Sequence, residues 1–145
     1  IFDVAFNAYY VSNQSRYDAN LPSLRRLSLV NNRIVDQELI PGVENLQVQF
    51  GIDRNGDGQI DMYVDGDDAR ITAGSIISTR LWLLVRSERG EAAQGFVDTR
   101  GPYQTPDASG LQIDPSADSD DYPPTHRRMA LSRTIVLRNR VTDGP

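Results

Sequence analysis

The sequence predicts a mainly β domain in which antiparallel strands are joined by long loops. Apolar residues recur at every second position in several segments, which is the period of half-buried strands. Clusters of Asn, Asp, Gly and Pro separate these segments, and such residues favour turns. No long stretch carries the apolar repeat of an amphipathic helix. Because 145 residues suit one domain with its own core, we expect a single β-rich domain over residues 1–145.

The N-terminal part predicts a first strand followed by a hairpin. The first strand, expected within IFDVAFNAYYV at residues 1–11, alternates at four positions: Val4, Phe6, Ala8 and Tyr10. Segments 23–30 and 33–40 predict the two arms of the hairpin. Their connection, Asn31-Asn32, favours a tight turn because Asn tolerates a positive φ. Pro41-Gly42 is expected to end the second arm.

The middle of the chain predicts a long strand over residues 43–53. Its apolar side chains are expected to face one way: Leu46, Val48, Phe50 and Ile52. An acidic loop follows, and residues 62–64 predict a short return strand. We expect a helical turn over residues 66–74, with Asp67 or Asp68 as its capping residue.

The C-terminal part predicts two more strands separated by a long polar loop. Residues 76–87 are apolar on both faces near their centre, which is typical of a strand inside a sheet. Residues 88–128 are rich in Pro, Asp, Ser and Gly and predict either a functional surface loop or a flexible excursion. Residues 128–140 predict the last strand.

Bulk composition excludes several classes of protein. The net charge of −5 argues against nonspecific nucleic-acid binding, which needs a basic face. The absence of Cys excludes disulfides, thiolate catalysis and zinc–cysteine sites. The most apolar stretch, residues 76–85, contains Arg80 and is shorter than the roughly 18 residues that span a bilayer.

The stretch GIDRNGDGQIDMYVDGD at residues 51–67 suggests a calcium loop. Its spacing would wrap oxygen ligands around one centre, as the about six to eight oxygens of a calcium site require. The twelfth position is Val64 instead of a bidentate Glu, and no helices are expected on either side. The alternative is a turn in which Asp and Asn accept backbone N–H groups. The candidate metal ligands are Asp53, Asn55, Asp57, Gln59 through its backbone carbonyl, and Asp61.

No catalytic constellation emerges from the sequence. His126 is the one histidine, and it lacks a nucleophile in a recognisable motif, so we expect it on the surface or at the start of a strand. The acids of the long polar loop have no sign of the burial that raises a pKa for proton transfer: Asp118, Asp120 and Asp121. The sequence therefore predicts that the chain is not an enzyme.

Aromatic and arginine side chains fit structural roles. The aromatic spacing suits core and cross-strand pairs: Tyr9, Tyr10, Phe50, Tyr63 and Trp82. The arginines of the expected strands favour solvated strand faces, with pairing to acidic residues of a partner subunit as the alternative: Arg25, Arg26, Arg127, Arg128, Arg133, Arg138 and Arg140.

Four stretches together resemble the PilW family of type IV pilus minor pilins, which are prepilin-like assembly proteins related to the J-type minor pseudopilins. They are Tyr9-Tyr10 followed by SLRRLSL, LIPGVENLQVQFGIDRNGDGQIDMYV at 39–64, STRLWLLVRS at 78–87 and THRRMALSRTIVLRNR at 125–140. The resemblance implies a pilin-like α+β head. The family's N-terminal membrane helix has no counterpart here, so we expect the C-terminal part of a soluble head. The cysteine pair of many members is also absent.

The resemblance implies a noncatalytic structural role. Its expected partners are other minor pilins, the major pilin and a tip adhesin, in a tip complex that primes pilus assembly. The head would be periplasmic on an inner-membrane anchor and then extracellular in the pilus, touching the membrane only through the absent helix. The alternative is a calcium-binding or carbohydrate-binding β module of a secreted adhesin or enzyme.

Overall fold

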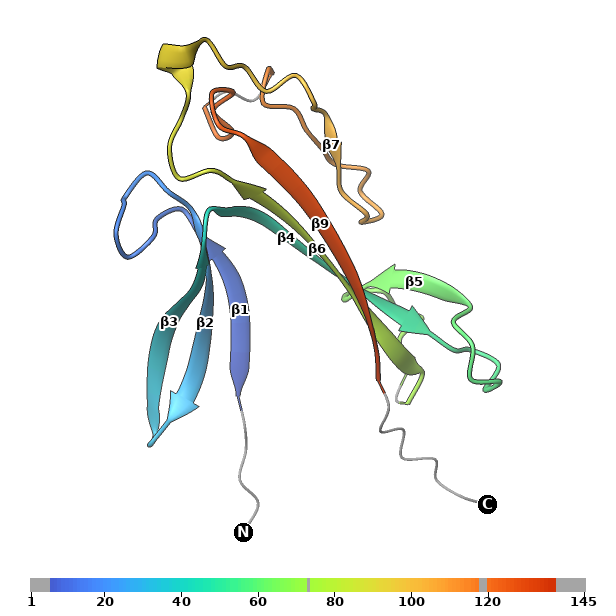
Figure 1. Ribbon diagram of the computed structural model, residues 1–145. Helices are drawn as coiled ribbons and strands as arrows, with labels where there is room; N and C mark the ends of the chain where they lie inside the picture. The colour runs from blue at the N-terminus through green and yellow to red at the C-terminus, as the bar shows by residue number, and fades with distance from the viewer. Residues whose placement is uncertain (1–5, 73, 118–119, 138–145) are drawn as a thin grey trace.

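The structure is a computed structural model that describes residues 6–72, 74–117 and 120–137, and within them the chain is mainly β. Nine strands in these residues form three antiparallel sheets (Figure 1). The helical element is the short 3₁₀ helix Ala92–Gln94. Across the same ranges, no helix has the length and apolar character needed to cross a membrane. The predicted fold class, antiparallel β sheet with long connections, is confirmed.

The first sheet holds β1 (Asn7–Ser12), β2 (Ser23–Val30) and β3 (Arg33–Pro41) in that spatial order. The β2–β3 turn has Asn31 at φ 49° and Asn32 at φ 62°. Two positive φ angles are what a tight hairpin turn needs to match strand twist, so the predicted hairpin is confirmed. Part of the predicted first strand lies outside the described residues, which begin at residue 6.

The second sheet has the order β5-β4-β6-β9, with bounds β4 (Val43–Ile52), β5 (Met62–Asp65), β6 (Ile76–Arg86) and β9 (Arg128–Val136). The prediction that residues 76–87 form an interior strand is confirmed, because β6 pairs with β4 on one side and with β9 on the other. The strand predicted over 128–140 runs to Val136, and residues 138–140 lie outside the described residues.

Gly42 carries the chain from the first sheet to the second, where β3 ends and β4 begins (Figure 1). Its N–H donates to the carbonyl of Pro22 at 2.7 Å, and its carbonyl accepts the N–H of Arg86 at 2.8 Å. With φ at +82°, a Cβ here would lie 2.6 Å from the Arg86 carbonyl oxygen. Glycine is therefore required both by conformation and by space.

The long polar segment between β6 and β9 contains a small two-stranded sheet of its own, β7 (Tyr103–Gln104) paired with β8 (Gln112–Ile113). Ile113 is 1% exposed and belongs to the buried cluster with Trp82 and Leu84 of β6. Tyr103 and Tyr122 pack against this cluster. The segment thus lies over one face of the second sheet and contributes Ile113 to its core.

The helical turn predicted over residues 66–74 is wrong for the residues described there. Two consecutive turns occupy this stretch instead: the Asp68 N–H donates to the Asp65 carbonyl at 3.1 Å, and the Ile71 N–H donates to the Asp68 carbonyl at 3.0 Å. The Asp68 carboxylate accepts the Arg70 N–H at 2.8 Å, so Asp68 makes the predicted capping contact, but in a turn. Residue 73 lies outside the described residues.

The aromatic residues divide between the core and the surface. Trp82 is buried, and Phe50 and Tyr63 are half-buried. The Arg80 guanidinium lies 3.4 Å from the centre of the Tyr63 ring. Tyr9 is 55% exposed and Tyr10 37% exposed. The expectation of core and cross-strand packing therefore holds for the second sheet, whereas the two tyrosines of β1 face solvent because no described segment covers the first sheet there.

Candidate functional site

The acidic loop joins β4 to β5, and Asp53 organises it. Asp53 is 4% exposed. Its carboxylate accepts the Gly56 N–H at 2.7 Å and the Gly58 N–H at 2.9 Å. Both glycines have positive φ, 81° and 85°, which lets the chain curl around this carboxylate. Asp53 thus holds the loop in a closed shape.

The remaining predicted ligands also make short-range hydrogen bonds. The Asn55 side-chain oxygen accepts the Asp57 N–H at 3.0 Å, and the Asp57 carboxylate accepts the Gln59 N–H at 2.8 Å. The Asp61 carboxylate accepts the Arg54 N–H at 2.7 Å. Within the described part of the chain, no group of three or more His, Cys, Asp or Glu side chains is arranged to hold a metal ion. These bonds match the turn alternative, and calcium binding stays a prediction.

Calcium at roughly 100 times its Kd should stabilise the folded chain by about 2.7 kcal/mol if it binds the folded state alone, so the thermal midpoint should rise. The replacement Asp57→Asn keeps an acceptor for the Gln59 N–H but removes a charge, and we expect it to reduce the rise. Asp67→Asn, outside the ligand set, is the matched control and should leave the rise unchanged. Equal midpoints in millimolar calcium and in chelator would contradict the prediction.

Four buried charged side chains form a cluster where β4, β6, β9 and the long segment meet. We call Glu44, Arg86, Asp98 and Arg128 the charge cluster. Arg128 donates to the Glu44 carboxylate from Nε at 2.6 Å and from Nη2 at 2.9 Å. Arg86 lies 3.4 Å from Glu44, and Arg128 lies 3.5 Å from Asp98. Their side chains are at most 6% exposed, and their formal charges cancel.

Hydrogen bonds from the long segment complete the charge cluster. The Tyr103 hydroxyl donates to Asp98 at 2.8 Å, and burial together with this bond raises the pKa of Tyr103 to about 12. Arg128 Nη2 donates to the Pro123 carbonyl at 3.0 Å. Arg86 donates to the carbonyl of Asn20, and burial lowers the pKa of Arg86. A buried charge is tolerated only when it is paired and hydrogen-bonded in this way.

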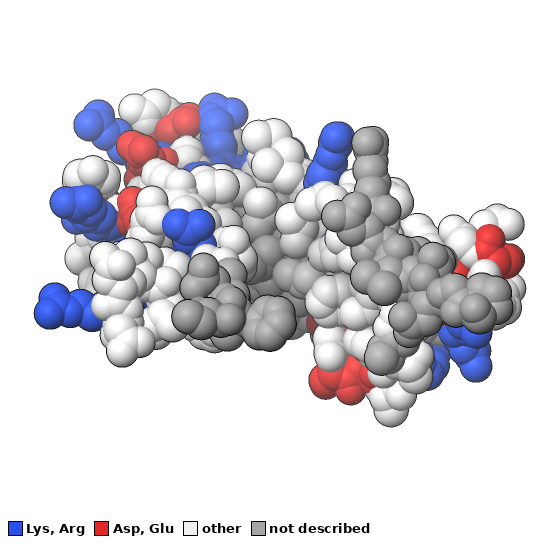
Figure 2. Space-filling view, turned by 90° about the horizontal axis from the view of Figure 1, so that it is seen from below, with Lys and Arg blue, Asp and Glu red and all other residues white. Residues whose placement is uncertain are grey.

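The solvated-face interpretation of the arginines is wrong for Arg128, which is 2% exposed. Its neighbour Arg127 fits better, because its side chain is 59% exposed and pairs with Glu91 at 2.8 Å. His126 is half-buried at the entry to β9, with Nδ1 2.9 Å from the Ser87 carbonyl oxygen. Arg25 pairs with Asp36 of its own sheet at 3.0 Å. Figure 2 shows basic and acidic residues intermixed at the end formed by the first sheet.

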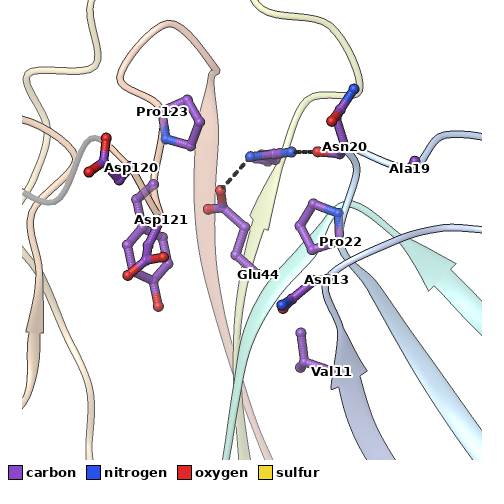
Figure 3. A pocket seen from close by; sticks show the side chains of 11 residues that line it. Val11, Asn13, Ala19, Asn20, Pro22, Glu44, Asp120, Asp121 and Pro123 are labelled. Carbon is purple, nitrogen blue, oxygen red and sulfur yellow. Dashed lines mark hydrogen bonds and ion pairs between the residues drawn. The ribbon is translucent and has the colours of Figure 1, made fainter.

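A pocket of about 460 Å³ lies beside the charge cluster. Glu44 and Arg86 line it together with Asn20 and Pro22, and Asp120 and Asp121 lie on the opposite side (Figure 3). None of its described lining residues is Ser, Thr, Cys, Lys or His. Asp118, the third predicted loop acid, lies outside the described residues.

The other face of the second sheet is open and mainly apolar, with Arg133 as its charged member on β9. Paired residues of an antiparallel sheet share a face, and the register aligns Leu46 with Leu83 and Leu83 with Leu131. We call this the open face. On β9 it is strongly exposed, with Met129 at 58%, Leu131 at 44% and Ile135 at 47%. Its other members are half-buried: Leu46, Val48, Phe50, Leu81, Leu83 and Val85.

The prediction that the apolar side chains of β4 share one face therefore holds for Leu46, Val48 and Phe50, whereas Ile52 follows a register shift and is fully buried. The long segment covers the opposite face instead. There Gln49 is 6% exposed, and its amide donates to Asp65 at 3.1 Å and to the Pro106 carbonyl at 2.7 Å.

Comparison with known proteins gives one match. The family model PilW, described as Type IV Pilus-assembly protein W, matches residues 8–139. No curated protein and no solved structure matches the chain. The matched range contains both large sheets except Asn7, together with the acidic loop and the charge cluster.

Proposed function

The chain belongs to the PilW family of type IV pilus-assembly proteins, and on that premise we propose that it is a noncatalytic minor pilin. In this proposal it joins other minor pilins in a tip complex that primes pilus assembly, with the major pilin and a tip adhesin as further partners. Its head is periplasmic on an inner-membrane anchor before assembly and extracellular afterwards. The observation that carries the proposal is the family match over residues 8–139.

Two features of the fold support a role in assembly. The open face presents apolar side chains that a second element or subunit would remove from water, and burial of such surface is the main driving force of association. Each member of the charge cluster is paired with another, which fits a structural role. The described residues thus offer contact surfaces for assembly.

Association with the other minor pilins of the same pilus system tests the proposal. We expect the purified chain to retain at least one of their soluble heads in a pull-down at high concentration, with a heat-unfolded sample as the control for nonspecific adhesion. Deletion of the gene should reduce surface pili, and the wild-type gene should restore them. Absence of any association, together with normal piliation after deletion, would refute the proposal.

A further inference from the structure

The outer edge of β9 is the longest unpaired strand edge of the second sheet. β9 pairs with β6 along residues 128–136, and no other described strand pairs with it. Every residue of β9 after Arg128 is exposed. The opposite edge strand, β5, has only four residues. An edge of this length is a template for another strand unless charge, a bulge or a covering element blocks it.

The register identifies which backbone groups face outward. The Leu137 N–H donates to the Ile77 carbonyl at 2.9 Å, and the Ser87 N–H donates to the Arg127 carbonyl at 2.8 Å. Because bonded pairs alternate in an antiparallel ladder, the odd-numbered residues of β9 bond to β6. The N–H and C=O groups of the even-numbered residues therefore face away from it: Ala130, Ser132, Thr134 and Val136.

One end of this edge is already closed. The Arg128 carbonyl also faces outward, and it accepts a hydrogen bond from Arg100 Nη2 at 2.5 Å. The long segment thus seals the start of β9 through Arg100. The edge that remains for a partner begins at Ala130, which gives the added strand a defined limit at this end.

Charge distinguishes among the strands that could add there. Residues 122–142 contain five arginines and no acidic residue, although the whole chain has a net charge of −5. Arg133 lies near the middle of the edge and makes no ion pair with a described residue. A second copy of β9 would bring one Arg133 towards another, and like charges on adjacent strands are destabilising. An acidic strand would instead pair with Arg133.

We propose that residues 130–136 of β9 accept an extended acidic segment of a partner pilus subunit as the fifth strand of this sheet. The proposal rests on the proposed function, because it needs a pilus partner, and it names the chemistry of that partner. Main-chain hydrogen bonds to the even-numbered residues give affinity, and Arg133 selects the acidic segment. The exposed side chains of Met129, Leu131 and Ile135 would contact the side chains of the added strand on the open face.

Residue-level hydrogen exchange tests the geometry. In the chain alone, the amides of Ala130, Ser132 and Thr134 should exchange fast, and those of Leu131 and Arg133 slowly because they bond to β6. In a complex with another minor pilin head, the even-numbered amides should become protected as well. A complex that leaves them unprotected would overturn the proposal.

A matched pair of variants tests the affinity. Ser132→Pro removes one outward N–H and leaves the bonds to β6 in place, so we expect about tenfold weaker binding. Ser132→Ala keeps the N–H and should change binding less than about twofold. Arg133→Glu keeps the backbone intact and should also weaken binding, which preserves the test if Ser132→Pro unfolds the chain.

The outcomes separate this inference from the proposed function. If the wild-type chain binds a pilin head and neither Ser132→Pro nor Arg133→Glu weakens that binding, the strand-addition proposal is overturned. The minor pilin role then still stands. If the chain forms a dimer and Ser132→Pro dissociates that dimer, the proposal is also overturned, because the strand added to β9 would then come from a second copy of the chain. Failure of the wild-type chain to bind any pilin head overturns both.

Discussion

Replacing Arg128 with methionine should lower the free energy of unfolding by about 3–5 kcal/mol, because it leaves buried charges uncompensated. The Arg128 side chain is 0% exposed and holds both Glu44, at 2% exposed, and Asp98, at 0% exposed. Without it, the ion-pair partner left to Glu44 is Arg86, and the one left to Asp98 is Arg100, whose side chain is 58% exposed. Methionine restores most of the volume, so the loss reports mainly on charge.

The adjacent arginine supplies a matched control. Arg127→Met removes a guanidinium that is 59% exposed and whose partner Glu91 is 33% exposed, and exposed pairs contribute at most about 1 kcal/mol. Urea unfolding followed by tryptophan fluorescence measures both variants, since Trp82 is the one tryptophan and belongs to the buried cluster beside this region. Equal losses for the two variants would contradict a buried charge cluster.

Local sequence patterns predict the strands and turns that depend on residues close together in the chain. The alternation along residues 43–53 and the apolar centre of 76–87 give β4 and the interior strand β6. The Asn31-Asn32 pair gives its hairpin because both residues adopt positive φ. Each of these features depends on side chains within a few positions of one another, which is the range that periodicity and turn preferences describe.

Features that depend on distant residues are missed. Arg128 and Glu44 are 84 positions apart, so no local pattern connects them. The one available signal was a Glu between apolar Val43 and Leu46 at the start of a strand, a place where a charge needs a partner. β7 and β8 have two residues each, too few to show a period. The long segment that carries β7 and β8 covers one face of the second sheet, and no local pattern indicates which face. The open face could therefore not be predicted either.

The sequence identifies the residues of the acidic loop but does not predict which groups their oxygens bind. The spacing of these residues suits a calcium loop over residues 53–61, but the carboxylates there accept backbone N–H groups of the same loop. The spacing does not specify whether those oxygens accept backbone N–H groups or a cation, because both need the same residue types at the same positions. Asp53 illustrates the turn alternative, because its carboxylate accepts two backbone N–H groups of the loop.

Replacing Ile113 with alanine should lower the free energy of unfolding by about 2–5 kcal/mol, the usual cost of truncating a buried isoleucine. Ile113 is 1% exposed and packs with Trp82 and Leu84. Most other residues of the segment from Ser87 to Arg127 are polar, so this side chain supplies a large share of the apolar contact that holds the segment on the sheet. Local opening should therefore become easier than global unfolding.

Limited proteolysis under native conditions should distinguish local release from global destabilisation. In Ile113→Ala we expect cleavage to increase within residues 88–127 before the strands of the second sheet are cut, since those strands keep their ladder bonds. Leu111→Ala is the control, because Leu111 lies two residues away and is 46% exposed, so its loss should be within about 0.5 kcal/mol. Cleavage that starts in β4 or β6, or equal behaviour of the two variants, would mean that the segment is held by its polar contacts to Arg128 and Gln49 and not by Ile113.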